Sequence, residues 1–145
     1  GLEVHRTQNE LRPYVSRLKD AGIRVSLFIA PDQIQLEAAE RVGAPVVELH
    51  TGAYCHAEGT ARDNELARIR EAAAMAQDLG LECHAGHGLS YETVGPIAQI
   101  PNVVELNIGH FLIGEAIFGG FDTAIKRMRA IMDRARGDSA VARST

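Results

Sequence analysis

The stretch VVELH at 46–50 decides between two α/β folds. In an extended strand, successive side chains point to opposite faces of the sheet. Glu48 and His50 therefore share one face, while Val47 and Leu49 share the other. The central strands of a doubly wound sheet are buried on both faces and are almost wholly apolar. A strand with one polar and one apolar face instead favours the wall of a barrel, whose interior can hold polar side chains.

A second stretch, VVELNIG at 103–109, repeats this pattern. Glu105 and Asn107 fall on one face, and the apolar face holds Val104, Leu106 and Ile108. One predicted strand separates the two stretches, and alternate strands of a (β/α)₈ barrel fill the same interior layer. Glu48 and Glu105 are thus expected in one layer, unless the repeat is a chance recurrence of common strand residues.

Short apolar runs alternate with amphipathic helical stretches, which predicts a parallel sheet with right-handed crossovers. The predicted strands are 24–29, 46–49, 81–85 and 103–108. The predicted helices are a periodic stretch from Leu11 that ends at Gly22, then 31–43, 62–79, 91–98 and 113–134. About four βα units form half of a (β/α)₈ barrel, which takes about 250 residues when complete. We expect a partial TIM-barrel domain at 1–136 and a disordered tail at 137–145.

The composition excludes several other classes of protein. The chain has 145 residues, of which 46% are hydrophobic and 23% are charged, so it is neither a disordered chain nor a disulfide scaffold. A net charge of −4 gives no reason to expect nucleic acid or an anionic membrane as a partner. No apolar run approaches the roughly 20 residues of a membrane span. With only Cys55 and Cys83 as cysteines, a cytoplasmic location is expected.

The densest chemical signal is AGHGLSYET at 85–93. Gly86 and Gly88 flank His87 where the third predicted strand ends, and barrel enzymes place their active sites at this carboxyl-terminal rim. Glycines let a backbone approach a ligand closely, and histidine exchanges protons near neutral pH. The motif predicts His87 as an acid/base residue, with a loop histidine held by backbone groups as the structural alternative.

The segment NIGHFLIGEAIFGG at 107–120 has a strand end followed by a glycine-spaced helical stretch. Loops after the last strands of a barrel often form a phosphate site with a short extra helix, whose free amides bind the anion. Gly88, Gly109 and His110 would donate these hydrogen bonds. The alternative is that these glycines serve only the turns.

Glu48 is expected inside the barrel, where a buried carboxylate needs a partner. That partner is either a positive reaction centre or a structural neighbour, His50 or Asn107. No metal is expected, because the histidines and cysteines form neither a Cys-x-x-Cys nor a His-Glu-x-x-His motif. Cys55 and Cys83 are expected as free thiols.

Four segments together resemble the pyridoxine 5′-phosphate synthase family: RLKDAGIRVSLFI, GAPVVELHTGAY, LGLECHAGHGLSYETV and VVELNIGHFLIGEAIFGG. The resemblance runs from about residue 1 to residue 136, and AGHGL-x-Y followed by ELNIGH is its most specific part. It covers only the C-terminal half of the family's (β/α)₈ barrel, strands five to eight.

The resemblance implies a transferase of vitamin B6 synthesis that condenses 1-deoxy-D-xylulose 5-phosphate with 3-amino-2-oxopropyl phosphate. The products are pyridoxine 5′-phosphate, inorganic phosphate and water, and no metal or organic cofactor takes part. By resemblance, His87 is the acid/base histidine and Glu48 stabilises charge in the transition state. Gly88, Gly109 and His110 match positions that bind the amino-ketone phosphate. The family implies a homo-oligomer, an octamer.

The family's first four strands supply further active-site residues that have no counterpart in this sequence. We therefore expect the chain to be inactive alone, either as part of a longer protein, which the first residue Gly1 favours, or as a short relative. Two other functions stay open. One is another phosphosugar lyase or isomerase on a barrel, and the other is a non-catalytic half-barrel that binds phosphate.

Overall fold

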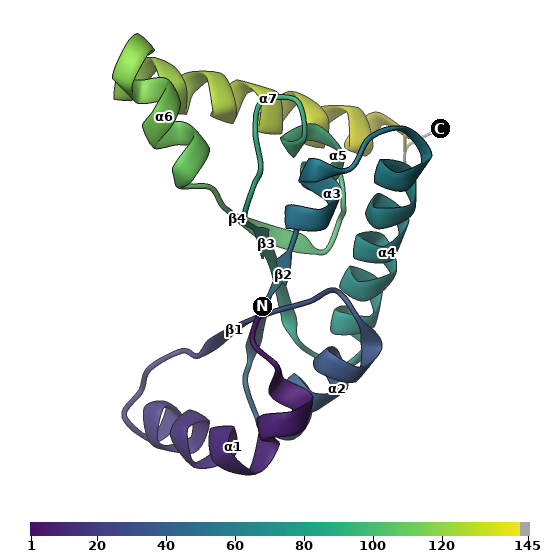
Figure 1. Ribbon diagram of the computed structural model, residues 1–145, viewed down its shortest axis with the longest axis vertical. Coiled ribbons are helices and arrows are strands. Elements are labelled where there is room, and N and C mark those ends of the chain that lie inside the picture. The colour runs from purple at the N-terminus through teal and green to yellow at the C-terminus, as the bar shows by residue number, and fades with distance from the viewer. Residues whose placement is uncertain (143–145) are drawn as a thin grey trace.

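The computed structural model describes the backbone of residues 1–142 and the side chains of residues 1–137. Strands and helices alternate along the chain as predicted (Figure 1). The elements are α1 (Val4–Asp20), β1 (Ser26–Ile29), α2 (Gln33–Arg41), β2 (Val46–His50), α3 (Gly52–His56), α4 (Gly59–Asp78), β3 (Glu82–Gly86), α5 (Val94–Ala98), β4 (Val103–Asn107), α6 (His110–Gly119) and α7 (Phe121–Ala142). In the described part of the chain, no helix is both long and apolar enough to span a membrane.

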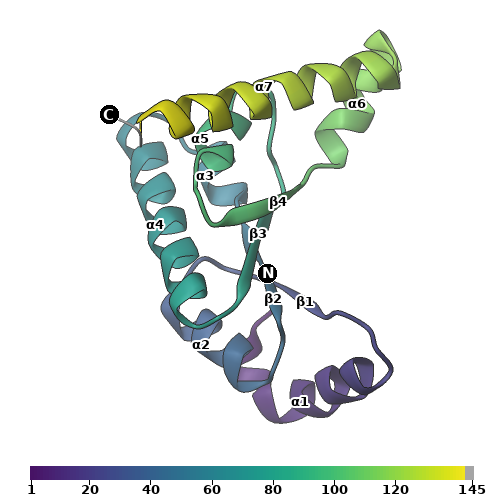
Figure 2. The same ribbon diagram turned by 180° about the vertical axis from the view of Figure 1, so that it is seen from behind.

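The four strands form one parallel sheet in the order β1-β2-β3-β4. Each strand pairs with the next one along the chain, so the order never reverses as it does in a doubly wound sheet. Helices α2 and α4 lie along one side of the sheet, and α1 and α7 lie at opposite ends of the molecule (Figures 1 and 2). This arrangement confirms the α/β prediction of half a (β/α)₈ barrel with parallel strands.

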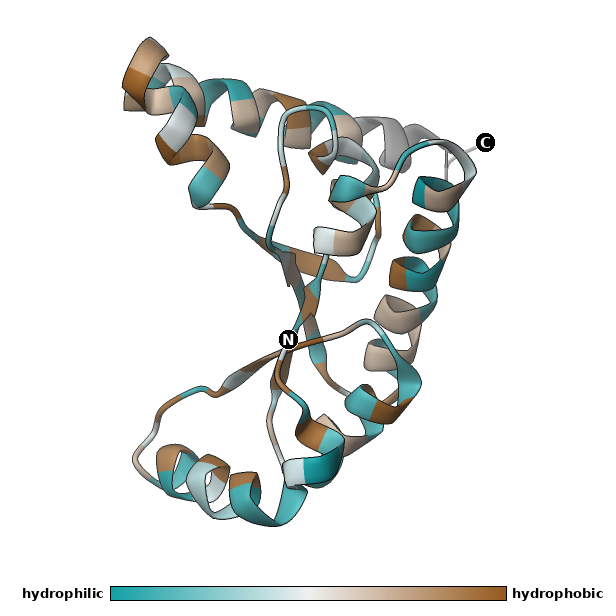
Figure 3. Cartoon of the chain, in the orientation of Figure 1, coloured by the Kyte–Doolittle hydropathy of each residue, from teal (hydrophilic) through white to brown (hydrophobic). Residues whose placement is uncertain are grey.

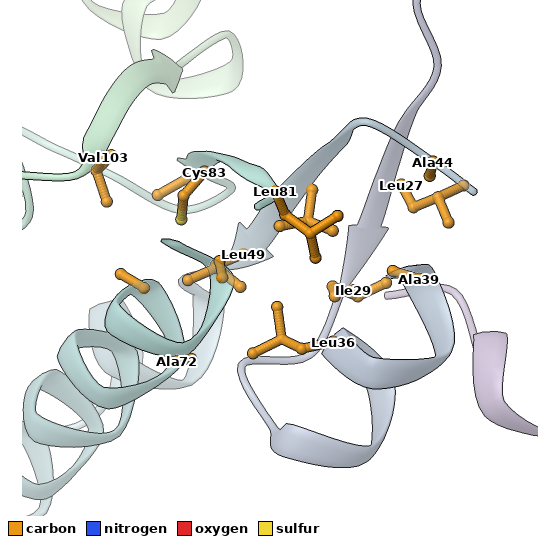
Figure 4. Close-up of a cluster of buried hydrophobic side chains, with 14 of the residues drawn as sticks. Leu27, Ile29, Leu36, Ala39, Ala44, Leu49, Ala72, Leu81, Cys83 and Val103 are labelled. Atoms are coloured by element: carbon orange, nitrogen blue, oxygen red, sulfur yellow. The ribbon is translucent and has the colours of Figure 1, made fainter. Parts of the chain in front are cut away.

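The two faces of β2 differ as the alternation predicts. Val47 and Leu49 are fully buried, and they join the main core between the sheet and helices α2 and α4 (Figure 4). Glu48 and His50 lie on the opposite face and are only half-buried. The apolar face therefore holds the helices, and the polar face remains available for chemistry.

Strand β4 departs from the predicted alternation because it contains a bulge. Val103 pairs with Cys83, but the next pair is Glu105 with His84, so Val104 is an extra residue without a partner on β3. Val103 is buried in the core, whereas the side chain of Val104 is 62% exposed. The prediction that Val104 faces the helices is therefore wrong, and Val103 takes that place.

The C-terminal region also differs from the predicted single helix at 113–134. Two helices, α6 and α7, meet at Gly120, whose φ of +80° ends α6 in a conformation that favours glycine. Helix α6 is rich in apolar residues, and Ile117 and Phe118 are 76% and 93% exposed on it (Figure 3). Helix α7 continues to Ala142, beyond the predicted start of the tail, and residues 143–145 lie outside the described residues. The short helix α3 has no counterpart among the predicted elements.

The two faces of the sheet can be tested by two substitutions to alanine. Leu49→Ala removes a fully buried side chain and is expected to lower the free energy of unfolding by about 2–5 kcal/mol. Val104→Ala changes an exposed side chain and is expected to change it by less than about 0.5 kcal/mol. Urea unfolding of both variants measures the difference, and equal losses would contradict the bulge.

Candidate functional site

One pocket of about 820 Å³ brings together all five residues that the sequence singles out. It lies where the strands end, and it is also lined by Phe28, Asn107 and the loop after β3. The parallel strands explain this convergence, since their carboxyl ends meet at one edge of the sheet. The five residues are His87, Glu48, Gly88, Gly109 and His110.

His87 occupies a strained turn directly after β3. Its φ is +77°, and the φ of Gly88 is +85°, so two successive residues are left-handed. His87 is the sole non-glycine residue with a positive φ in the described part of the chain. Such a conformation costs on the order of 1–3 kcal/mol in a non-glycine residue and occurs preferentially at functional sites.

The imidazole of His87 is exposed to the pocket and has two aromatic neighbours. Its ring centroid lies 4.8 Å from that of His50 and 6.1 Å from that of Phe28. His50 also makes an edge contact with Phe28 at 5.1 Å. Burial is the main factor that lowers the pKa of His50, and the nearby charge of His87 adds to this effect. The arrangement leaves His87 as the ring that is open to solvent and to a ligand.

Glu48 has the structural partner that the sequence left undecided. Its Oε2 accepts a hydrogen bond from Nδ2 of Asn107 at 3.0 Å, across β3. Burial raises the pKa of Glu48, although this hydrogen bond opposes the shift. A carboxylate with a raised pKa at the pocket wall can stabilise positive charge when ionised and can hold a proton when neutral.

Gly86 makes the Glu48–Asn107 contact possible. A Cβ at this position would collide with Oε1 of Glu48 and would lie 2.8 Å from the backbone oxygen of Asn107. The sequence predicts only that Gly86 lets the backbone approach a ligand closely. The structure gives it a specific role, which is to leave room for a hydrogen bond between the strands on either side.

A cluster of titratable side chains lies on the same face. His84 is 5% exposed, with Nε2 at 2.7 Å from Oε1 of Glu82 and Nδ1 at 3.3 Å from Oε1 of Glu105. The strand register aligns Glu48, His84 and Glu105 across β2, β3 and β4. Glu105 thus lies on the same face as Glu48, as the alternation predicts, but its side-chain partner is His84.

Two turns offer backbone groups to the pocket. Gly109 is the N-cap of α6 and His110 its first helical residue, so the first amides of a ten-residue helix lie at the pocket edge. A Cβ at Gly109 would meet nothing within 4 Å. The space around Gly109 is therefore free for a ligand. At Gly88 a Cβ would lie 3.2 Å from the Cβ of Cys55, so the side chain of Cys55 packs closely against this turn.

Several histidines line the pocket. Its lining residues within the described chain include the histidines His56, His87 and His110 but no lysine or arginine.

The described residues also contain no group of three or more His, Cys, Asp or Glu side chains arranged to hold a metal. Both cysteines are free thiols, and burial raises the pKa of Cys55 and raises that of Cys83 to about 12. Neither thiol is therefore a ready nucleophile.

The raised pKa of Glu48 predicts a pH-dependent effect of Glu48→Gln. The folded protein binds this proton more tightly than the unfolded chain, so the carboxylate costs stability as pH rises above its usual pKa of 4.5. Glutamine does not titrate. Relative to the wild type, the variant is expected to gain stability between pH 4 and pH 7, measured by urea unfolding at both values.

Glu82→Gln is the matched control, because its hydrogen bond with His84 is the main factor that lowers the pKa of Glu82. Its carboxylate stabilises the fold above the usual pKa of 4.5, and this contribution is lost as pH falls through the lowered value. The control is therefore expected to lose stability relative to the wild type between pH 4 and pH 7. A shift of both variants in the same direction would contradict this interpretation.

Among known proteins, the model of the family described as "Pyridoxal phosphate biosynthesis protein PdxJ" matches residues 1–134 of this chain. Three relatives, each named pyridoxine 5′-phosphate synthase, come from Roseobacter denitrificans (61% identical), Jannaschia sp. (62%) and Rhodospirillum rubrum (62%). The matches cover 93–94% of this chain but only 55–56% of each relative. The chain thus spans about half the length of these relatives, and it belongs to the PdxJ family of pyridoxal phosphate biosynthesis proteins.

Proposed function

We propose that this chain forms the C-terminal half of a pyridoxine 5′-phosphate synthase barrel. The complete barrel would condense 1-deoxy-D-xylulose 5-phosphate with 3-amino-2-oxopropyl phosphate and release pyridoxine 5′-phosphate, inorganic phosphate and water. The observation on which this proposal rests is the convergence of His87, Glu48 and two glycine turns on one pocket, in a chain that belongs to this family. The proposed reaction needs no metal or organic cofactor. We also propose that the complete protein is a homo-oligomer in the cytoplasm.

His87 is the proposed acid/base residue. Imine formation, dehydration and loss of phosphate all require protons to move to and from substrate atoms, and a histidine can both donate and accept them near neutral pH. The exposed ring at the pocket supports this role, because the ring contacts His50 and Phe28 without being enclosed by them. The ring lines the same pocket as Gly109 and His110.

Glu48 is the proposed electrostatic partner of the reaction. An imine nitrogen gains positive charge on protonation, and a carboxylate a few ångströms away lowers the energy of that charged state. The hydrogen bond from Asn107 fixes the carboxylate at the pocket wall, so little reorganisation is needed when charge develops.

The phosphate of the amino-ketone is proposed to lie between the two turns. Gly88, Gly109 and His110 line the same pocket, and neighbouring parallel strands lie about 5 Å apart. A phosphate between them would accept amide hydrogen bonds from both loops and from the start of α6. The open space at Gly109 is consistent with a group as large as a phosphate.

The proposal is tested by joining this chain to the part of the Roseobacter denitrificans relative that lies outside the match. We expect no product from the 145 residues alone and turnover of both substrates by the joined protein. In the joined protein, His87→Ala is expected to lower kcat by about 10²–10⁴-fold, the usual contribution of an acid/base group. Turnover by the 145-residue chain alone, or an unchanged kcat in His87→Ala, would overturn the proposal.

The phosphate turn is tested by Gly109→Val in the same joined protein. The fold has room for this side chain, so the variant is expected to remain stable while its methyl groups occupy the phosphate position. Loss of one charged hydrogen bond, worth about 1.5–3 kcal/mol, corresponds to a rise of roughly 10–100-fold in KM for the amino-ketone phosphate. Gly114→Val is the control, since it has equally open surroundings in α6 but does not line the pocket. Equal effects on both substrates would place this phosphate elsewhere.

A further inference from the structure

The segment that follows β2 forms hydrogen bonds with the turn that contains His87. We propose that Thr51 is a positioning residue, whose buried hydroxyl holds His87 in its left-handed conformation and so directs the imidazole into the pocket. This inference rests on the proposed role of His87, but Thr51 itself touches neither substrate nor reacting atoms.

The contacts of Thr51 are short and fully enclosed. Its side chain is 0% exposed, and the single hydrogen of Oγ1 is shared between the carbonyl oxygens of Gly86 at 2.8 Å and His87 at 2.7 Å. The backbone amide of Thr51 also donates to the oxygen of Gly86 at 2.9 Å. One residue of the β2 loop therefore binds two successive carbonyl groups of the β3 loop.

Helix capping does not explain this threonine. Thr51 is the N-cap of α3, and a threonine at that position ordinarily accepts a hydrogen bond from an amide of the helix. Here the side chain makes no such bond and points to the neighbouring loop instead. The hydroxyl thus serves the turn at 86–88 and not the helix that it precedes.

The turn needs this hydroxyl for an energetic reason. A left-handed conformation at His87 costs on the order of 1–3 kcal/mol, so the surrounding structure must hold it. The other side-chain contact of the His87 oxygen is Sγ of Cys55 at 3.9 Å, which is a weak interaction. Without the hydroxyl, the His87 carbonyl would lose the one close side-chain donor that the described residues give it, and the turn could relax toward an ordinary backbone conformation.

The same segment also fixes the position of the ring. A Cβ on Gly52 would lie 2.7 Å from Nε2 of His50 and 3.2 Å from Cδ2 of His87, so only glycine lets both rings reach this place. The ring of His50 then packs 4.8 Å from that of His87. Thr51 holds the backbone of the turn, while the residues on either side of it shape the space for the imidazole.

The first test measures the conformation of His87 by NMR in the 145-residue chain. A left-handed residue has a short distance between its amide proton and its Hα, which gives a strong nuclear Overhauser effect within the residue. We expect this signal in the wild type and in Thr51→Ser, which keeps the hydroxyl, and a marked loss of it in Thr51→Val. Tyr54→Phe is the matched control, because it removes another buried hydroxyl, bonded to the Thr93 oxygen at 3.0 Å, without touching the turn.

Thr51→Val could disrupt folding as a whole, and a second pair of variants covers that case. Thr51→Ala and Thr51→Ser both lack the methyl group, so their difference isolates the hydroxyl. We expect the His87 signal in Thr51→Ser and its loss in Thr51→Ala. A signal retained in every folded variant without the hydroxyl, or lost equally in Thr51→Ser, would overturn the inference.

The second test is a double-mutant cycle in the joined protein described above. We expect Thr51→Val to lower kcat about tenfold, as a displaced acid/base group would, and to change KM by less than about twofold. In the His87→Ala background the same substitution is expected to change kcat by less than about twofold, because Thr51 acts through His87. A full tenfold loss in both backgrounds would show a general structural role and would overturn the inference.

The two tests separate this inference from the proposed function. An unchanged kcat in His87→Ala would remove the catalytic role of His87, while the NMR signal would still decide whether Thr51 holds the turn. A catalytic His87 with an unaltered signal in Thr51→Val would retain the proposed function and reject Thr51 as its positioning residue.

Discussion

The site depends on a hydrogen bond that passes over a strand. Glu48 on β2 and Asn107 on β4 are two strands apart, roughly 10 Å in a parallel sheet, and their side chains meet above β3. They can do so because Gly86 has no side chain in the space between them. This contact sets the pocket wall, and the turn that begins at Gly86 then brings His87 to its rim. A side chain at 86 would separate Glu48 from Asn107 and displace the turn at the same time.

The pocket contains several features that work against stability. Burial disfavours the charged form of Glu48, and His87 has a left-handed backbone. Glu48 lies on the polar face of β2, opposite the fully buried Val47 and Leu49, and His87 lies in the turn that follows β3. One strand thus presents a strongly stabilising face and a functional face, and a shift of register by one residue would exchange them. The apolar face fixes the register, and the register keeps the costly residues in place.

The sequence predicts those features that repeat with a fixed period. Alternation in 46–50 placed Glu48 and Leu49 on their correct faces, and the glycines around His87 located the turn. The prediction for Val104 is wrong because a bulge depends on how β4 pairs with β3, which the sequence of one strand does not reveal. The sequence does not predict the break at Gly120, because apolar residues continue on both sides of it. Thr51 could not be identified, since its hydroxyl binds residues 35 and 36 positions further along the chain.

The charges of the pocket suggest how the proposed site divides its tasks. Two phosphorylated substrates together bring up to four negative charges, and burying them requires hydrogen bonds and opposite charge. The described half supplies backbone amides, three histidines and one glutamate, but no lysine or arginine at the pocket. Backbone amides can bind one phosphate, as at the start of α6, yet they leave much of the second one uncompensated. For the proposed barrel, we therefore expect the permanent cations to come from the other half, while this half contributes groups that can gain and lose protons. Such a division would explain why the pocket proposed to bind phosphate is lined by histidines, whose charge can change during the proposed reaction.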